Sequence, residues 1–184
     1  MSHPRVIKLQ TSQPLVDQIL QASRDRSVLD CGGEGAQATI DADDIRRACA
    51  AERAAERDPF GVRIANAEVA GSFDLSGFQL GEPLHFLGCT FTEAAVFEGA
   101  DLQELVFTGG QSWGYEGFGE WPKCQLPGLL ANGVRIRRDL VLSGSLITGA
   151  HYTPAFIRQS AAIWLAEATI GGRLLAMGTQ VLTN

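Results

Sequence analysis

The chain has 184 residues, of which 45% are hydrophobic and 20% charged, and its formal net charge is −6. This length allows one domain, or one domain with a small appendage, and the apolar fraction is too high for a disordered tail. No apolar run approaches a membrane span, and the first residues lack a signal-peptide pattern. We therefore expect a cytoplasmic protein that does not associate with membranes.

The charge is distributed unevenly along the chain. Residues 1–60 carry a net charge of −2, residues 61–125 one of −7, and residues 126–184 one of +3. A basic footprint is absent, so we expect no direct nucleic-acid binding, while the acidic middle suits a basic protein partner. The four cysteines are scattered without a C-x-x-C pair, so neither a metal site nor a redox pair is predicted.

Residues 1–60 predict a small N-terminal cap that contains helices. The stretches "RVIKL" and "SVLD" are typical of short strands. "SQPLVDQILQA" predicts a helix that Ser12 caps, and "IDADDIRRACAAERAAER" predicts a second helix that Asp41 caps. We expect Leu15 of the first helix and Ile45 of the second to face the interior close to Ile64.

The loop before this second helix mimics a nucleotide-binding loop. Gly33, Gly35 and Ala38 follow a predicted strand with the spacing of a glycine-rich phosphate loop. The next residues, "ATIDADD", do not begin a helix where a phosphate would need a helix N-terminus. A plain turn is therefore the preferred interpretation, and no cofactor is predicted.

From Val62 onward the apolar residues follow an eleven-residue period. One such series is Val69, Leu80, Phe91 and Leu102. Neither a helix nor a flat strand has this period, whereas a chain that turns a corner every five or six residues does. We predict a mainly β fold in which residues 61–184 form a right-handed parallel β-solenoid with about 22 residues per coil. In that register Leu75 lies beside Phe97.

Two segments interrupt the period, and long loops in a regular repeat are where function usually lies. They are residues 109–124, which include the aromatic stretch 112–121, and residues 149–161. Residues there that could bind a flat or cationic ligand are Trp113, Tyr115, Glu116, Trp121, His151, Tyr152 and Arg158. The aromatic rings could instead simply cover one flank of the solenoid, which is the preferred interpretation, although both stay open.

Other polar residues give weaker patterns. His85 lies between Leu84 and Phe86, so it should point outward from a strand. No Ser or Cys partner for it is evident, and no catalytic residue is predicted. Five arginines of the last third could hold an anion or form a solvated face: Arg135, Arg137, Arg138, Arg158 and Arg173.

Two families resemble this sequence. The five- or six-residue step around a Leu or Phe centre resembles the pentapeptide-repeat family, and "GADL" at 99–102 is close to its motif. That resemblance implies a quadrilateral β-helix, and some members are acidic rods that mimic duplex DNA and bind topoisomerases. "GVRIANAEVAGSFDLSG", "LPGLLANGVRIRRDLVLSGSLITGAH" and "AAIWLAEATIGGRLLAMGTQV" resemble a group of bacterial repeat proteins often labelled membrane-associated oxidoreductases. No cofactor or anchor pattern accompanies that label, so we expect neither.

The leading functional hypothesis is a non-enzymatic solenoid that presents a binding surface to a protein partner. Its sharper form, a DNA mimic that binds a topoisomerase, predicts an acidic stripe of Glu68, Asp74, Glu82, Glu93, Glu98, Asp101 and Glu104. The alternative is an enzyme or small-molecule-binding protein whose site lies on the aromatic stretch 112–121 and the loop 149–161.

The last repeat predicts an association surface. Leu174, Val181 and Leu182 would leave unpaired backbone groups and apolar side chains in water. We favour a homodimer that joins two copies at this end. Coverage by the loop 149–161, or by further repeats of a longer protein, is the alternative.

Overall fold

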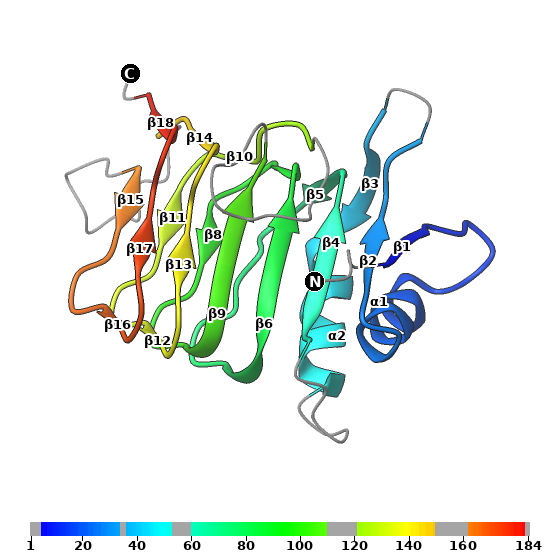
Figure 1. Ribbon diagram of the computed structural model, residues 1–184, viewed down its shortest axis with the longest axis horizontal. Coiled ribbons are helices and arrows are strands. Elements are labelled where there is room, and N and C mark those ends of the chain that lie inside the picture. Colours follow the sequence, from blue (N-terminus) through cyan, green and yellow to red (C-terminus); the bar gives the residue numbers. More distant parts are fainter. Residues whose placement is uncertain (1–4, 34–35, 53–59, 110–120, 150–161, 183–184) are drawn as a thin grey trace.

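In the part of the chain that the structure describes, short parallel strands are the main regular structure, and two helices accompany them at one end (Figure 1). The computed structural model describes residues 5–33, 36–52, 60–109, 121–149 and 162–182. Within these residues, every pairing between two named strands is parallel. The fold is therefore mainly β with parallel sheets, as the sequence predicts.

The N-terminal segment contributes strands as well as helices. In chain order its elements are β1 (Arg5–Lys8), α1 (Leu15–Arg24), β2 (Ser27–Asp30), β3 (Ala38–Asp41) and α2 (Ala42–Glu52). The two predicted strands and both predicted helices are confirmed, whereas β3 is not among the predictions. Asp41 caps α2, because its Oδ1 accepts a 2.8 Å hydrogen bond from the Asp43 amide. The Ser12 cap is wrong, since Pro14 precedes α1 and no side chain caps that helix.

The largest sheet has nine strands. Its order is β1-β2-β4-β6-β9-β12-β16, and β13 and β17 continue beside the second half of β9. Its remaining members are β4 (Val62–Ala65), β6 (Gln79–Leu87), β9 (Asp101–Thr108), β12 (Arg135–Ile136), β13 (Leu140–Val141), β16 (Thr169–Ile170) and β17 (Leu174–Leu175). The N-terminal segment joins this sheet directly, because β2 pairs with β4.

Two smaller sheets complete the stack. The six-stranded sheet has the order β18-β14-β10-β7-β5-β3, and the three-stranded sheet has the order β15-β11-β8. The strands of the six-stranded sheet besides β3 are β5 (Ala67–Ala70), β7 (Thr90–Phe91), β10 (Gln125–Leu126), β14 (Leu146–Ile147) and β18 (Gln180–Val181). Those of the three-stranded sheet are β8 (Ala95–Val96), β11 (Leu129–Leu130) and β15 (Ile163–Trp164).

The pairing register repeats the spacing that the sequence predicts. Val69 lies opposite Phe91, and Leu80 lies opposite Leu102, both twenty-two residues apart. An isolated parallel bridge joins Asp74 to Val96, which sets Leu75 opposite Phe97. The spacing grows to 34 where an interrupting segment lies between the two strands, as in the pair Leu102 and Ile136.

An aromatic cluster lies at the centre of the stack. Phe73, Phe86, Phe97 and Phe107 have no exposed surface, and Phe91 has only 3%. Phe86 stacks on Phe107 with ring centroids 5.3 Å apart, and it meets Phe73 edge to face at the same distance. Such pairs stabilise a core beyond the area they bury.

The helices lie beside the first strands and far from the last ones. In Figure 1, α1 and α2 stand at the end of the stack near β2 and β3, and β15 to β18 stand at the opposite end. Ile19 of α1 and Ile45 of α2 are both fully buried in the same core cluster as Ile64, as predicted for Ile45. Among the described residues the two ends of the stack therefore differ: helices pack against one, and the strands β15 to β18 form the other.

Candidate functional site

A buried histidine and a buried carboxylate meet on the outer face of the nine-stranded sheet. His85 Nε2 lies 2.9 Å from Glu104 Oε2, and the two residues are 2% and 5% exposed. Val106 is the register partner of His85, and Pro83 is that of Glu104, so the pair spans β6 and β9 diagonally. The ionised carboxylate can only accept, so the histidine donates this hydrogen bond through Nε2–H.

The prediction that His85 points outward is confirmed for the backbone but wrong in its implication of solvent contact. Alternation along β6 sends Leu84 and Phe86 to the core and His85 to the other face. That face is itself covered, because Leu87 and Val106 beside His85 are also fully buried. Alternation identifies the side of a sheet but not what packs on it.

Burial controls the protonation of His85. Desolvation lowers its pKa, and the positive charges of Arg63 and Arg138 lower it further, while the hydrogen bond to Glu104 and its charge oppose the shift. Arg63 is the register neighbour of His85 on β4. The imidazole is therefore held neutral, and the pair suits a structural hydrogen bond better than it suits a general acid.

An ion pair continues this polar row toward the surface. The Leu105 amide donates to the Asp139 carbonyl, so Asp139 borders the strand position of Glu104. Arg173 donates to the Asp139 carboxylate from Nη2 at 2.6 Å, from Nε at 3.2 Å and from its amide at 2.8 Å. These bonds lower the pKa of Asp139. His85, Glu104, Asp139 and Arg173 thus follow one another across the sheet.

The five arginines could hold an anion or form a solvated face, and two of them are paired with carboxylates. Arg137 pairs with Asp101 through two hydrogen bonds of 3.1 and 3.2 Å, and Arg173 pairs with Asp139. Arg158 lies outside the described residues. Two of the five arginines therefore have their charge balanced locally by a carboxylate.

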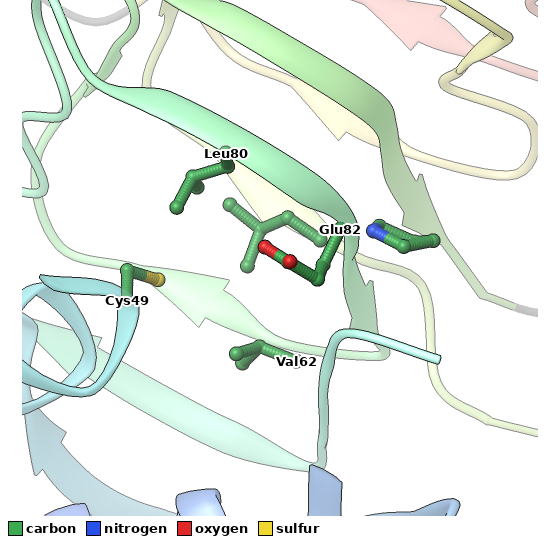
Figure 2. A pocket seen from close by; sticks show the side chains of 6 residues that line it. Cys49, Val62, Leu80 and Glu82 are labelled. Atoms are coloured by element: carbon green, nitrogen blue, oxygen red, sulfur yellow. The ribbon is translucent and has the colours of Figure 1, made fainter. Parts of the chain in front are cut away.

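A second buried carboxylate faces a small apolar pocket on the inner side of β6. Figure 2 shows the Glu82 carboxylate between Leu80 and Val62, across from Cys49 of α2. The register between β6 and β9 shifts between Leu80 and Pro83, and such a bulge re-aims side chains. The cavity is only about 10 Å³, whereas ligand pockets measure roughly 300–1,000 Å³. It has no room for a substrate.

The acidic stripe expected of a DNA mimic is not formed as predicted. Glu82 and Glu104 are 6% and 5% exposed, so neither contributes to a surface potential. Asp101 is engaged by Arg137. Glu93 and Glu98 remain exposed, but the sequence could not show that a bulge and a covered sheet face would bury two of the seven positions.

Most residues of the predicted loop site lie outside the described residues: Trp113, Tyr115, Glu116, His151, Tyr152 and Arg158. Trp121 is described and half-buried, and it packs against Val28, Ala65 and Leu87 on the outer face of the nine-stranded sheet. For Trp121 this position corresponds to the covering role that the sequence left open.

The glycine-rich loop leads into a strand. Gly32 forms an antiparallel bridge with Gln37, and β3 follows, so α2 begins only at Ala42. This is the geometry of a turn between two strands, and it provides no helix N-terminus for a phosphate.

Among residues 5–33, 36–52, 60–109, 121–149 and 162–182, no three His, Cys, Asp or Glu side chains gather as metal ligands. Within the same residues, no helix has the length and apolarity to cross a membrane.

The predicted association residues are on the surface. Leu174, Val181 and Leu182 are 52%, 48% and 53% exposed, and Met177, which sequence reasoning missed, is 50% exposed. We call these four side chains the C-terminal face.

Comparisons of the chain with protein-family models, with curated proteins and with solved structures each return no match.

Proposed function

We propose that the chain is a right-handed parallel β-solenoid that serves as a protein-binding scaffold and docks a second copy on its C-terminal face. The 22-residue register and the three parallel sheets support the solenoid. The nine-stranded sheet supplies two sides of the last coil, through β16 and β17, and each smaller sheet supplies one. Parallel crossover connections are right-handed in nearly all proteins, which supports the hand.

The exposure of the C-terminal face is the observation that carries this function. Leu140 and Ile147 have no exposed surface, yet their strand partners Leu174 and Val181 are about half exposed. From one strand to the next along the stack, buried apolar side chains thus give way to half-exposed ones. Within the part of the chain that the structure describes, β15, β16, β17 and β18 also have no strand on their outer side, so backbone groups are open there as well.

A second copy fits this face better than a head-to-tail arrangement. The opposite end of the stack carries α1 and α2, whose buried residues already cover the first strands. A contact between that end and the C-terminal face would leave one C-terminal face open in every assembly. A two-fold contact between two C-terminal faces closes both at once, which is the usual symmetry of homodimers.

The area involved favours a weak dimer. Completing the burial of a half-exposed Leu, Val or Met contributes roughly 1 kcal/mol, so four side chains on each copy contribute on the order of 8 kcal/mol. Lost translational and rotational freedom opposes this by about 4–15 kcal/mol. Pairing of the open strand edges must supply the difference, and a dissociation constant in the micromolar range or above is expected.

Light scattering after gel filtration, over protein concentrations from about 1 µM to 1 mM, tests the proposal. The wild type should shift from the mass of one chain toward that of two. The variants Leu174→Glu and Val181→Lys should stay monomeric with an unchanged circular dichroism spectrum. Val6→Glu is the matched control, since Val6 is 45% exposed on β1 at the other end of the stack. A wild type that remains monomeric at 1 mM would overturn the dimer.

A further inference from the structure

The six-stranded sheet has a second open edge, at β3, next to the helices. In the described part of the chain β3 is the last strand of that sheet. In the neighbouring nine-stranded sheet, β1 packs outside β2 and supplies one further strand. After Leu9, whose amide still donates to the Asp30 carbonyl, the chain leaves the sheets and enters α1. The strand position outside β3 is therefore left open.

A groove of about 200 Å³ lies at this open position. It runs between β3 and the turn that leads from β1 into α1. Its lining residues are Leu9, Gln10, Thr11, Gln13, Leu15, Gln18, Thr39, Ile40, Asp41 and Asp44. Thr39 and Asp41 are exposed, whereas Ile40 is only 5% exposed. The groove thus has an apolar floor beside an accessible strand edge.

The backbone of Thr39 faces the groove. The Val69 carbonyl accepts a hydrogen bond from the Thr92 amide, so the backbone groups of Val69 point toward β7. The backbone groups of the adjacent Glu68 point to the opposite side, toward β3. Thr39 is the register partner of Glu68. In a pair of parallel strands, a residue whose N–H and C=O both bond to the other strand bonds to the two neighbours of its register partner. The N–H and C=O of that register partner therefore point away from the first strand. Thr39 therefore presents a donor and an acceptor to an incoming strand.

The far wall of the groove is held rigid by one buried side chain. Gln18 is 5% exposed, and its Oε1 accepts from the Gln10 amide at 2.7 Å. Its Nε2 donates to the Gln10 carbonyl at 2.8 Å and to the Gln13 carbonyl at 2.9 Å. The turn is thereby fixed against α1, so a ligand would enter a preformed groove and would order little of the protein.

The charge of the lining selects the ligand. Asp41 and Asp44 are the charged residues among the lining side chains, and no basic side chain is among them. Asp44 also forms an ion pair with Arg47 outside the lining, so Asp41 carries most of the net negative charge of the groove. The floor offers Leu9, Leu15 and Ile40 to apolar side chains. A strand exposes alternate side chains on opposite faces, so one peptide can meet both features.

We propose that this groove binds an extended peptide segment of another protein, which adds to the β3 edge and alternates apolar with basic side chains. Backbone hydrogen bonds to Thr39 provide affinity, and the apolar floor and the two carboxylates provide selectivity. This site is independent of the C-terminal face, which lies at the opposite end of the stack.

Fluorescence polarisation with the labelled peptide TKVKLKVT tests the proposal, and TEVELEVT is the charge-reversed probe. We expect saturable binding of the first peptide and at least tenfold weaker binding of the second. Thr39→Pro removes the outward N–H at an edge position where proline is tolerated, and it should weaken binding about tenfold. Val181→Pro is the matched control, because it removes the outward N–H of β18 at the other open edge of the same sheet and should leave binding unchanged.

A second variant separates recognition from folding. Asp41→Asn with Asp44→Asn keeps a good helix cap and removes the negative charge, so it should weaken binding of TKVKLKVT several-fold and abolish the difference between the two peptides. If Thr39→Pro fails to fold, this double variant tests whether the groove binds the peptide. The proposal is overturned if TKVKLKVT shows no saturable binding up to 1 mM. Equal binding of both peptides to the wild type, or unchanged binding by both the proline and the asparagine variants, would overturn it as well.

Discussion

Replacement of Phe86 by alanine tests the packing at the centre of the stack. Phe86 has no exposed surface, and its ring lies between those of Phe73, Phe91 and Phe107, with centroids 5.3, 5.0 and 5.3 Å away. The Phe107 ring belongs to the neighbouring strand, since Phe86 lies opposite Phe107 in the register of β6 and β9. The substitution therefore removes contacts between successive turns of the proposed solenoid and leaves each strand in place.

The expected loss of stability is about 4 kcal/mol. A buried Phe→Ala substitution costs roughly 3–5 kcal/mol, and the cost rises where the surroundings cannot collapse. The backbone of β6 is hydrogen-bonded to β4 on one side and β9 on the other, so the cavity should persist. The three ring contacts add to the loss beyond the area removed. Total stabilities of ~5–15 kcal/mol leave such a variant folded but much weakened.

Urea unfolding followed by circular dichroism measures the effect. With a slope of about 2 kcal/mol per molar urea, the midpoint should fall by about 2 M. Phe78→Ala is the matched control, because Phe78 is only partly buried and packs at the edge of the core, with the Arg46 guanidinium 5.6 Å from its ring centre. That control should lose about 1 kcal/mol. Equal losses in the two variants, or a loss below about 2 kcal/mol for Phe86→Ala, would refute the packing argument.

Three further perturbations address local features. Burial holds the pKa of His85 below its usual value, so the unfolded chain takes up a proton near pH ~6.5 that the folded chain does not bind. The free energy of unfolding should thus fall as pH drops from 7.5 to 5.5, and His85→Gln should flatten the profile; a wild type without that fall contradicts the assignment. Gly61 and Gly77 both have a positive φ, but a Cβ at Gly61 would overlap the Pro83 carbonyl oxygen while one at Gly77 meets nothing. Gly77→Ala should cost about 1 kcal/mol, and Gly61→Ala clearly more, in thermal melts. Desolvation raises the pKa of the buried Cys89 to about 12, so a thiol reagent should modify it only as fast as the protein unfolds.

The period of apolar residues was sufficient to predict the pairing register. A stack of short parallel strands places chemically similar side chains at a fixed interval, so Val69 and Phe91, or Leu80 and Leu102, reveal their pairing directly. The interrupting segments change the interval but not the class of residue that pairs, as Ile136 opposite Leu102 shows. This signal is local in each turn and repeats, which is why one sequence contains enough of it.

The polar sites could not be predicted in the same way. Glu82 is buried through a bulge between Leu80 and Pro83, and Glu104 is buried because the outer face of its sheet is covered. Both causes depend on contacts between distant segments. The β3 strand was missed for a related reason. Its four residues Ala38–Asp41 alternate apolar with polar side chains, but they are few and overlap the stretch predicted as a helix, and they become a strand through pairing with β5. The groove beside β3 follows from that missed strand.

The two proposed surfaces make a combined prediction, because they lie at opposite edges of one sheet and differ in chemistry. The edge at β18 is rimmed by exposed Val181 and Leu182, whereas that at β3 is rimmed by Asp41 and glutamines. Val181→Lys should abolish the dimer and leave binding of TKVKLKVT unchanged. Thr39→Pro should weaken peptide binding about tenfold and leave the mass in light scattering unchanged. If either variant removes both properties while its unfolding midpoint matches the wild type, the two edges are coupled and the assignment of separate surfaces is wrong.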